Sequence, residues 1–145
     1  MASAPIVVAV YGTLRRGERN EPFLAGATHI GHGRIRGRIH EIRESATRPY
    51  AYPALVDAIE PTDEVVVELY VLPDAAALDA LDALEAFDPT DDDRSEYLRR
   101  EVSVADGPVG AAWAYLYHGS PTDLGARIPS GDWVAHAHPH VAEAP

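Results

Sequence analysis

Hydrophobic runs of β type, separated by glycine and proline, are the main pattern along the chain. Residues 5–10 are apolar on both faces, which is typical of a strand buried inside a sheet or barrel. Residues 64–72 combine β-branched and aromatic side chains and predict the clearest strand. Two further strands, at 96–104 and 109–117, are separated by the turn 105–108, so we expect them to pair antiparallel.

The segments between these strands carry weaker signals. Residues 27–41 alternate but are broken by glycines, which predicts one or two short strands with a bend or bulge. Residues 45–57 hold Tyr50, Tyr52 and a proline, and we expect a structured loop or an edge strand in which the tyrosines mainly pack. Asn20 is expected to cap a short helix that runs to residue 27.

Helical periodicity is convincing in only one stretch. Asp74 is a natural N-cap, and alanine and leucine fill a helix predicted over 75–87. At about 100° per residue, Leu78, Leu81 and Leu84 form one apolar arc, with Asp82 at its edge. Glu85 falls inside the arc, so its carboxylate points where the leucines point.

A carboxylate in that direction has two interpretations. Glu85 either reaches solvent at the end of the helix, or lies desolvated with a raised pKa, because burial disfavours the charged form. A carboxylate with a raised pKa beside a pocket is suited to general acid/base chemistry near neutral pH. The helical pattern alone leaves both open.

The stretch Tyr11-Gly12-Thr13-Leu14 follows the first strand directly. Gly12 either only ends the strand, or lets successive backbone N–H groups converge on an anion such as a carboxylate. Residues 15–19 are expected to form a polar surface loop. A phosphate-binding loop is disfavoured, because the Gly-Lys-(Ser/Thr) ending and an immediately following helix are both missing from the pattern.

Composition narrows the classes of function. The 145 residues carry a net charge of −11, which argues against nucleic acid or an anionic membrane surface as a partner. The chain has no cysteine, so thiol catalysis is excluded, and its apolar runs are too short to span a membrane. We therefore expect one cytoplasmic domain over 1–145, with about 136–145 as a flexible tail; the composition does not indicate an oligomeric state.

Metal binding has only weak support. His29 and His32 have no third ligand at a metal spacing, and the aspartates of residues 87–95 lack the spacing of a calcium loop. The alternating histidines 136, 138 and 140 are capable of holding a transition metal, but a mobile tail is the favoured interpretation. We predict no metal site and no cofactor.

Five short motifs together resemble the γ-glutamylcyclotransferase-like superfamily, and most closely its avirulence-induced-protein-like branch, which includes γ-glutamylamine cyclotransferases and the butirosin-pathway enzyme. Tyr11-Gly12-Thr13-Leu14 resembles the family's binding loop, and residues 81–85 resemble the helix end that carries the catalytic glutamate. Tyr97-Leu98-Arg99, residues 113–115 and residues 131–133 resemble its later motifs, in the family's order. Ala86 is a departure, because members often have glycine there.

The resemblance implies an α+β fold, with a small mixed, mostly antiparallel β-barrel flanked by helices. It also implies an acyltransferase- or lyase-type cyclisation, in which a γ-glutamyl substrate releases 5-oxoproline and a free amine without a cofactor. Glu85 would be the general base and then the general acid. The implied small-molecule site comprises Tyr11, Gly12, Thr13, Leu14, Tyr97, Arg99 and Tyr115.

Two points stay open at this stage. Arg99 either pairs with a carboxylate or is structural. A non-catalytic or differently acting binding module on the same fold is the main alternative function, because fold does not fix substrate. A serine triad is disfavoured, since no serine lies on a Gly-x-Ser-x-Gly elbow.

Overall fold

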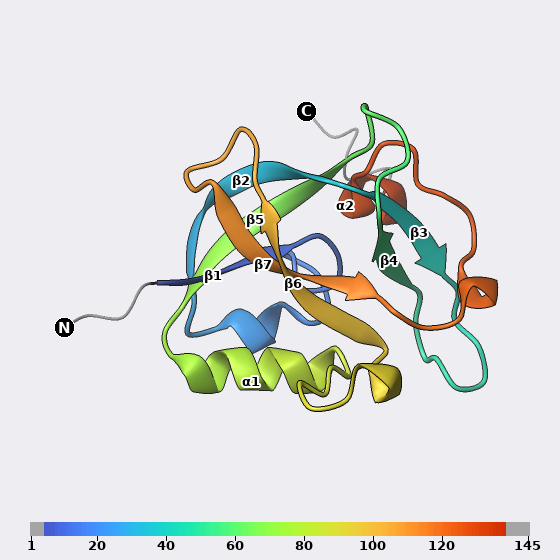
Figure 1. Cartoon of the computed structure of the whole chain (residues 1–145), viewed down its shortest axis with the longest axis horizontal. Coiled ribbons are helices and arrows are strands. Elements are labelled where there is room, and N and C mark those ends of the chain that lie inside the picture. Colours follow the sequence, from blue (N-terminus) through green and yellow to red (C-terminus); the bar gives the residue numbers. More distant parts are fainter. Residues whose placement is uncertain (1–4, 139–145) are drawn as a thin grey trace.

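A five-stranded curved sheet is the centre of the protein in a computed structural model, which describes residues 5–138 (Figure 1). The strand order is β2-β5-β1-β7-β6, and β3 pairs with β4 in a second, two-stranded sheet. The strands are β1 (Ile6–Val10), β2 (Thr28–Arg36), β3 (Arg38–Ile42), β4 (Tyr52–Val56), β5 (Glu64–Leu72), β6 (Tyr97–Ser103) and β7 (Ala111–Tyr117). The helices are α1 (Ala75–Leu84) and α2 (Trp133–Ala137), with short 3₁₀ turns η1 (Glu21–Leu24), η2 (Asp92–Arg94) and η3 (Pro121–Asp123).

Strand β1 occupies the middle of the large sheet. It pairs antiparallel with β5 and parallel with β7, whereas the β2–β5, β6–β7 and β3–β4 pairs are antiparallel. This position explains why the run is apolar on both faces: Val8, Ala9 and Val10 are all buried. The expected strands, the bulge in β2 near Gly31 and the mixed, mostly antiparallel α+β class are confirmed.

The expected β-barrel is found only in part, because the strands of residues 5–138 form two sheets and no closed barrel. The large sheet curls until its edges meet at one point. There the Arg34 N–H donates to the Ala105 carbonyl at 2.9 Å, and the Ala105 N–H donates back at 2.8 Å. Pairing goes no further because the chain turns at Gly37, and β3 leaves the large sheet to pair with β4.

The predicted helix is present but ends earlier than expected. Asp74 accepts the Ala77 N–H at 2.9 Å, as a capping residue should. The helix stops at Leu84 rather than at residue 87, because Ala86 adopts a left-handed backbone conformation with φ of 52°. Glu85 is therefore the residue that follows the last turn.

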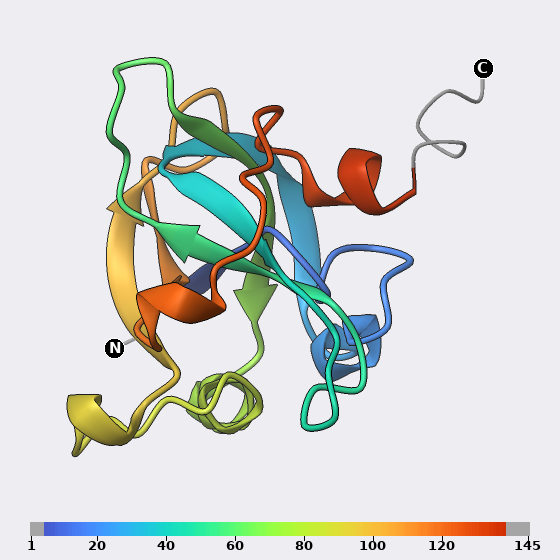
Figure 2. The same cartoon turned by 90° about the vertical axis from the view of Figure 1, so that its right-hand side faces the viewer.

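Two hydrophobic clusters flank the sheet. One includes Ile39, Leu69 and Trp133, and the other places Leu81 of α1 against Tyr115 of β7. Figures 1 and 2 agree that α1 and α2 lie at opposite ends of the molecule. No helix in residues 5–138 has the length and apolar character needed to cross a bilayer.

The short helices η1 and α2 differ in how their N-termini are capped. Asn20 makes no capping bond at η1; its side chain binds Thr13 instead. Asp132 does cap α2, accepting the Ala135 N–H at 3.2 Å. The helix α2 extends to Ala137, and the rest of the segment predicted as a tail, including His140, lies outside the described residues.

Candidate active site

A cavity of about 410 Å³ opens between the end of β1, the β3–β4 connection and the end of α1. Almost every predicted site residue lines it, although they come from four separate segments of the chain. The exception is Arg99. The predicted residues on the cavity surface are Tyr11, Gly12, Thr13, Leu14, Glu85, Tyr97 and Tyr115.

The loop after β1 presents free backbone donors to this cavity. The carbonyls of Gly12 and Thr13 accept N–H groups from Arg15 at 3.0 Å and from Asn20 at 2.8 Å, which fixes the turn. Within residues 5–138, no protein acceptor binds the N–H groups of Gly12, Thr13 or Leu14. Three successive free donors beside a cavity are suited to an anion such as a carboxylate.

Position 12 requires glycine because the Pro53 side chain packs closely against its backbone, and not because of an unusual φ. A Cβ there would lie 2.4 Å from Pro53 Cγ and 2.8 Å from Pro53 Cδ. Pro53 is itself fixed, because the buried Tyr97 hydroxyl donates to its carbonyl at 2.8 Å. The loop and β4 therefore meet at a contact that a larger side chain at position 12 would force apart.

A buried ionic network holds the same loop from behind. Arg15 Nε lies 2.8 Å from Glu68 Oε2, and its Nη1 lies 2.7 Å from Asp132 Oδ1. The other Glu68 oxygen accepts the Arg16 backbone N–H at 2.8 Å and the Tyr70 hydroxyl at 3.0 Å. Burial alone would raise the pKa of Glu68, but these bonds hold it below its ordinary value.

Sequence interpretation missed this network, because it placed Arg15 in a surface loop. Arg15 is only 7% exposed. One signal was present: Glu68 interrupts the apolar run of β5, and a carboxylate in a buried strand needs a cationic partner.

Glu85 contributes the carboxyl group of the cavity. Its backbone N–H still bonds to the Leu81 carbonyl at 2.9 Å, while its partly buried side chain faces the cavity. Burial raises the pKa of Glu85 to about 8, and the nearby Glu96 carboxylate adds to the shift. The carboxyl group therefore faces the cavity, where partial burial disfavours its charged form.

Glu96, Tyr52 and Arg48 also line the cavity and were not predicted as site residues. The Tyr52 hydroxyl donates to Glu96 Oε1 at 2.6 Å and accepts from Arg48 Nε at 3.0 Å. Burial, followed by the bond to Glu96, raises the pKa of Tyr52 above its ordinary value. The connection between β3 and β4 has no helical or strand periodicity from which its place beside the cavity could be predicted. The pair of tyrosines beside a proline was the only sequence signal for this segment.

Arg99 lies outside the cavity surface and binds a protein carboxylate. Its Nε and Nη2 donate to Asp82 at 2.9 and 3.3 Å, and the Tyr115 hydroxyl donates to the same carboxylate at 2.6 Å. Its guanidinium carbon lies 4.8 Å from the Trp113 ring centroid. Arg99 thus supports Tyr115 from behind, which fits its structural interpretation.

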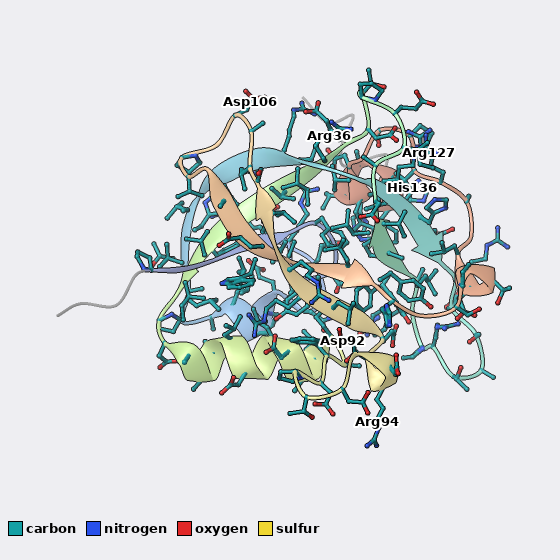
Figure 3. All side chains as sticks on the ribbon, in the orientation of Figure 1. Arg36, Asp92, Arg94, Asp106, Arg127 and His136 are labelled. Atoms are coloured by element: carbon teal, nitrogen blue, oxygen red, sulfur yellow. The ribbon has the colours of Figure 1, made fainter. Side chains whose placement is uncertain are left out.

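The charged surface groups lie away from this centre. Figure 3 shows Asp92 and Arg94 beside the C-terminal end of α1, with Arg127 and His136 on the opposite side of the molecule. His29 and His32 stack edge to face with centroids 5.3 Å apart. Among residues 5–138, no three His, Cys, Asp or Glu side chains are grouped to hold a metal ion.

The fold and site define a class: a small α+β protein whose cavity combines a loop of free backbone amides with the carboxyl groups of Glu85 and Glu96. Comparison with known families gives the particular family. The model described as "Gamma-glutamyl cyclotransferase, AIG2-like" matches residues 8–135. The chain belongs to this family, which confirms the resemblance seen in the five motifs.

One relative carries a matching description, and two solved structures share the fold. A Vibrio cholerae serotype O1 protein named "Putative gamma-glutamylcyclotransferase" is 35% identical over 128 residues, covering 88% of this chain and 94% of its own. The crystal structure of YkqA from Bacillus subtilis has a TM-score of 0.69 and 26% identity, covering 98% of this chain and 44% of that one. Uncharacterized protein PH0828 from Pyrococcus horikoshii shares the fold, with a TM-score of 0.68, 24% identity and coverage of 97% and 99%.

Proposed function

We propose that this protein is a γ-glutamylcyclotransferase that converts a γ-glutamyl amine or peptide into 5-oxoproline and a free amine. The observation that carries the proposal is that Glu85 and the free amides of Gly12, Thr13 and Leu14 share one cavity. An acidic proton carrier and an anion-binding loop are the two functions that this cyclisation needs. Family membership independently favours the same chemistry.

The substrate would be held by its two charged ends. The α-carboxylate of the γ-glutamyl group binds the N–H groups of Gly12, Thr13 and Leu14, while the α-ammonium lies against Glu85. Tyr11, Tyr97 and Tyr115 enclose the intervening carbons. Since the hydroxyls of Tyr11 and Tyr97 already donate to backbone carbonyls, these rings act as rigid surfaces that hold the substrate folded.

The reaction then requires one proton to move between two nitrogens. The α-ammonium first gives one proton to solvent. The resulting α-amine nitrogen attacks the γ-carbonyl carbon and forms the ring C–N bond, while Glu85 accepts the second proton that this nitrogen loses. The tetrahedral intermediate collapses, the C–N bond to the leaving amine breaks, and Glu85 returns the proton to that amine. Neither water nor a cofactor is consumed.

A pKa of about 8 suits Glu85 to both steps, because a carboxyl group near neutrality both accepts and returns a proton readily. We expect Glu85→Gln to fold normally and to lose about 10²- to 10⁴-fold in kcat, as general acid/base catalysis typically contributes. Release of 5-oxoproline from a panel of γ-glutamyl amines measures this loss. Asp79→Asn, on the exposed side of the same helix, is the matched control and should keep wild-type activity.

Two results would contradict the proposal. Full turnover in Glu85→Gln would remove Glu85 from the mechanism. Absence of 5-oxoproline across the panel, with γ-glutamyl ligands still raising the melting temperature, would favour a binding module on the same fold instead.

A further inference from the structure

The cavity contains a second carboxylate, Glu96, directly before β6. Its backbone is fixed on both sides: the Glu96 N–H donates to the Ala86 carbonyl at 2.9 Å, and its carbonyl accepts the His118 N–H at 2.7 Å. Because Ala86 directly follows Glu85, the first of these bonds holds the two glutamates in a fixed relation to each other.

One oxygen of Glu96 is free to bind a ligand. Oε1 accepts the Tyr52 hydroxyl at 2.6 Å, whereas Oε2 has no protein donor within residues 5–138. No arginine or histidine of that range forms an ion pair with Glu96. A half-buried carboxylate with one unoccupied oxygen in a cavity favours a cationic ligand.

Arg48 does not cancel this charge, although it lines the same cavity. Its Nη2 lies 3.3 Å from Asp123 Oδ2, and its Nε donates to the Tyr52 hydroxyl. Asp123 therefore balances the charge of Arg48. Arg19 is also nearby, but its guanidinium carbon sits 3.7 Å from the Tyr50 ring centroid and Arg19 does not line the cavity.

The proposed function already occupies the other polar groups of the site. The γ-glutamyl carboxylate takes the amides of the loop, and its α-ammonium takes Glu85. Glu96 is then the cavity carboxylate that is available to the leaving group. The net charge of −11 acts in the same direction, because it attracts cationic substrates and repels anionic ones at long range.

We propose that Glu96 selects γ-glutamyl amines whose leaving group carries a second positive charge, such as the γ-glutamyl amides of short aliphatic diamines. This inference rests on the proposed function and names its substrate class. In it, Glu96 Oε2 accepts a charge-assisted hydrogen bond from the distal ammonium, and Tyr52 holds the carboxylate in place. Peptides that end in a carboxylate, such as glutathione, are correspondingly poor substrates.

Three substrates of equal length test the inference: the γ-glutamyl amides of 1,4-diaminobutane, n-pentylamine and 5-aminopentanoate. They end in an ammonium, a methyl and a carboxylate group. We expect wild-type kcat/KM to fall in that order, with the ammonium substrate at least about tenfold above the methyl substrate, as a charge-assisted hydrogen bond provides. This comparison needs no variant, so it does not depend on whether any substitution is tolerated.

Glu96→Gln then assigns the preference to one side chain. The ratio of kcat/KM for the ammonium and methyl substrates should drop to within about threefold of unity. This ratio is insensitive to any change that the variant causes in Glu85, because both substrates use Glu85 in the same way. Glu101→Gln is the matched control: it removes the same charge from an exposed position on β6 and should leave the ratio unchanged.

The outcomes separate the two proposals. No 5-oxoproline from any of the three substrates would overturn the proposed function, and the inference with it. Turnover of all three at similar kcat/KM by the wild type would overturn the inference alone. So would an equal loss on all three in Glu96→Gln, since Glu96 would then bind the α-ammonium common to every substrate.

Discussion

The placement of Glu85 depends on how a single neighbouring residue ends helix α1. Ala86 has φ of 52°, and this turn lets its carbonyl accept the Glu96 N–H. A left-handed conformation strains a residue with a Cβ, and glycine avoids that strain. The alanine thus affects stability first and the chemistry only indirectly.

We expect Ala86→Gly to raise the free energy of unfolding by about 1 kcal/mol, because it removes the left-handed strain at an exposed site. Urea unfolding measures the change. Asp106, with φ of 59° in the turn after β6 (Figure 3), is the comparison, and Asp106→Gly should gain less because aspartate tolerates this conformation better. A loss of stability in Ala86→Gly would contradict the strain argument.

Residue patterns identified Glu85 but not Arg15, and the reason is physical. Helical periodicity fixes a direction, so a carboxylate among leucines is visible in the sequence. Whether an arginine after a glycine turn is buried depends on Glu68 and Asp132, which are far away in the chain. The same holds for Glu96, whose place in the cavity depends on Tyr52.

At the level of elements, the binding loop is positioned by contacts with β4, β5 and α2 rather than by its own sequence. Pro53 of β4 packs on Gly12, while Glu68 of β5 and Asp132 at the start of α2 hold Arg15. Strand positions could be predicted from β-type patterns. Barrel closure could not, because it depends on how long β2 stays in the sheet before the turn at Gly37.

Removing the arginine at the centre of these contacts should disturb both stability and activity. Arg15→Met leaves Glu68 buried without its cation, and we expect a loss of about 3 to 5 kcal/mol in the free energy of unfolding. Chemical denaturation measures it, and KM for a γ-glutamyl amine should rise as the loop loosens.

Arg16→Met provides the control for this experiment. The Arg16 side chain is exposed, and only its backbone N–H binds Glu68. A change within about 0.5 kcal/mol is expected, as for surface substitutions generally. Equal effects from both variants would show that the buried network is not what holds the loop.

At the scale of the whole molecule, the raised pKa of Glu85 connects its proton to global stability. The folded state holds this proton up to about pH 8, whereas the unfolded chain releases it near its ordinary value of 4.5. The contribution of this bound proton to the free energy of unfolding is therefore fully present below pH 4.5 and is lost as the pH rises through 8. The group that we propose for catalysis therefore lies at a position where it lowers stability in alkaline solution.

Glu85→Gln should abolish this dependence, because the amide does not titrate. We expect the variant to match the wild type near pH 5 and to exceed it at pH 9 by on the order of 2 to 4 kcal/mol, reduced from the unscreened value by partial exposure. Urea unfolding at both pH values measures the difference. Asp79→Asn should follow the wild type throughout, and an equal response of the two variants would contradict the assignment.

The bond between Arg15 and Asp132 has a consequence for the order of events during synthesis. The two residues are separated by 117 positions, so the loop that contains Arg15 is synthesised long before its partner at the start of α2. On the ribosome, the early β1 strand and its loop emerge without the partners that give them shape, and long-range pairing of this kind is slow. The loop that lines the cavity is therefore held in place only after the segment around Asp132 has been translated.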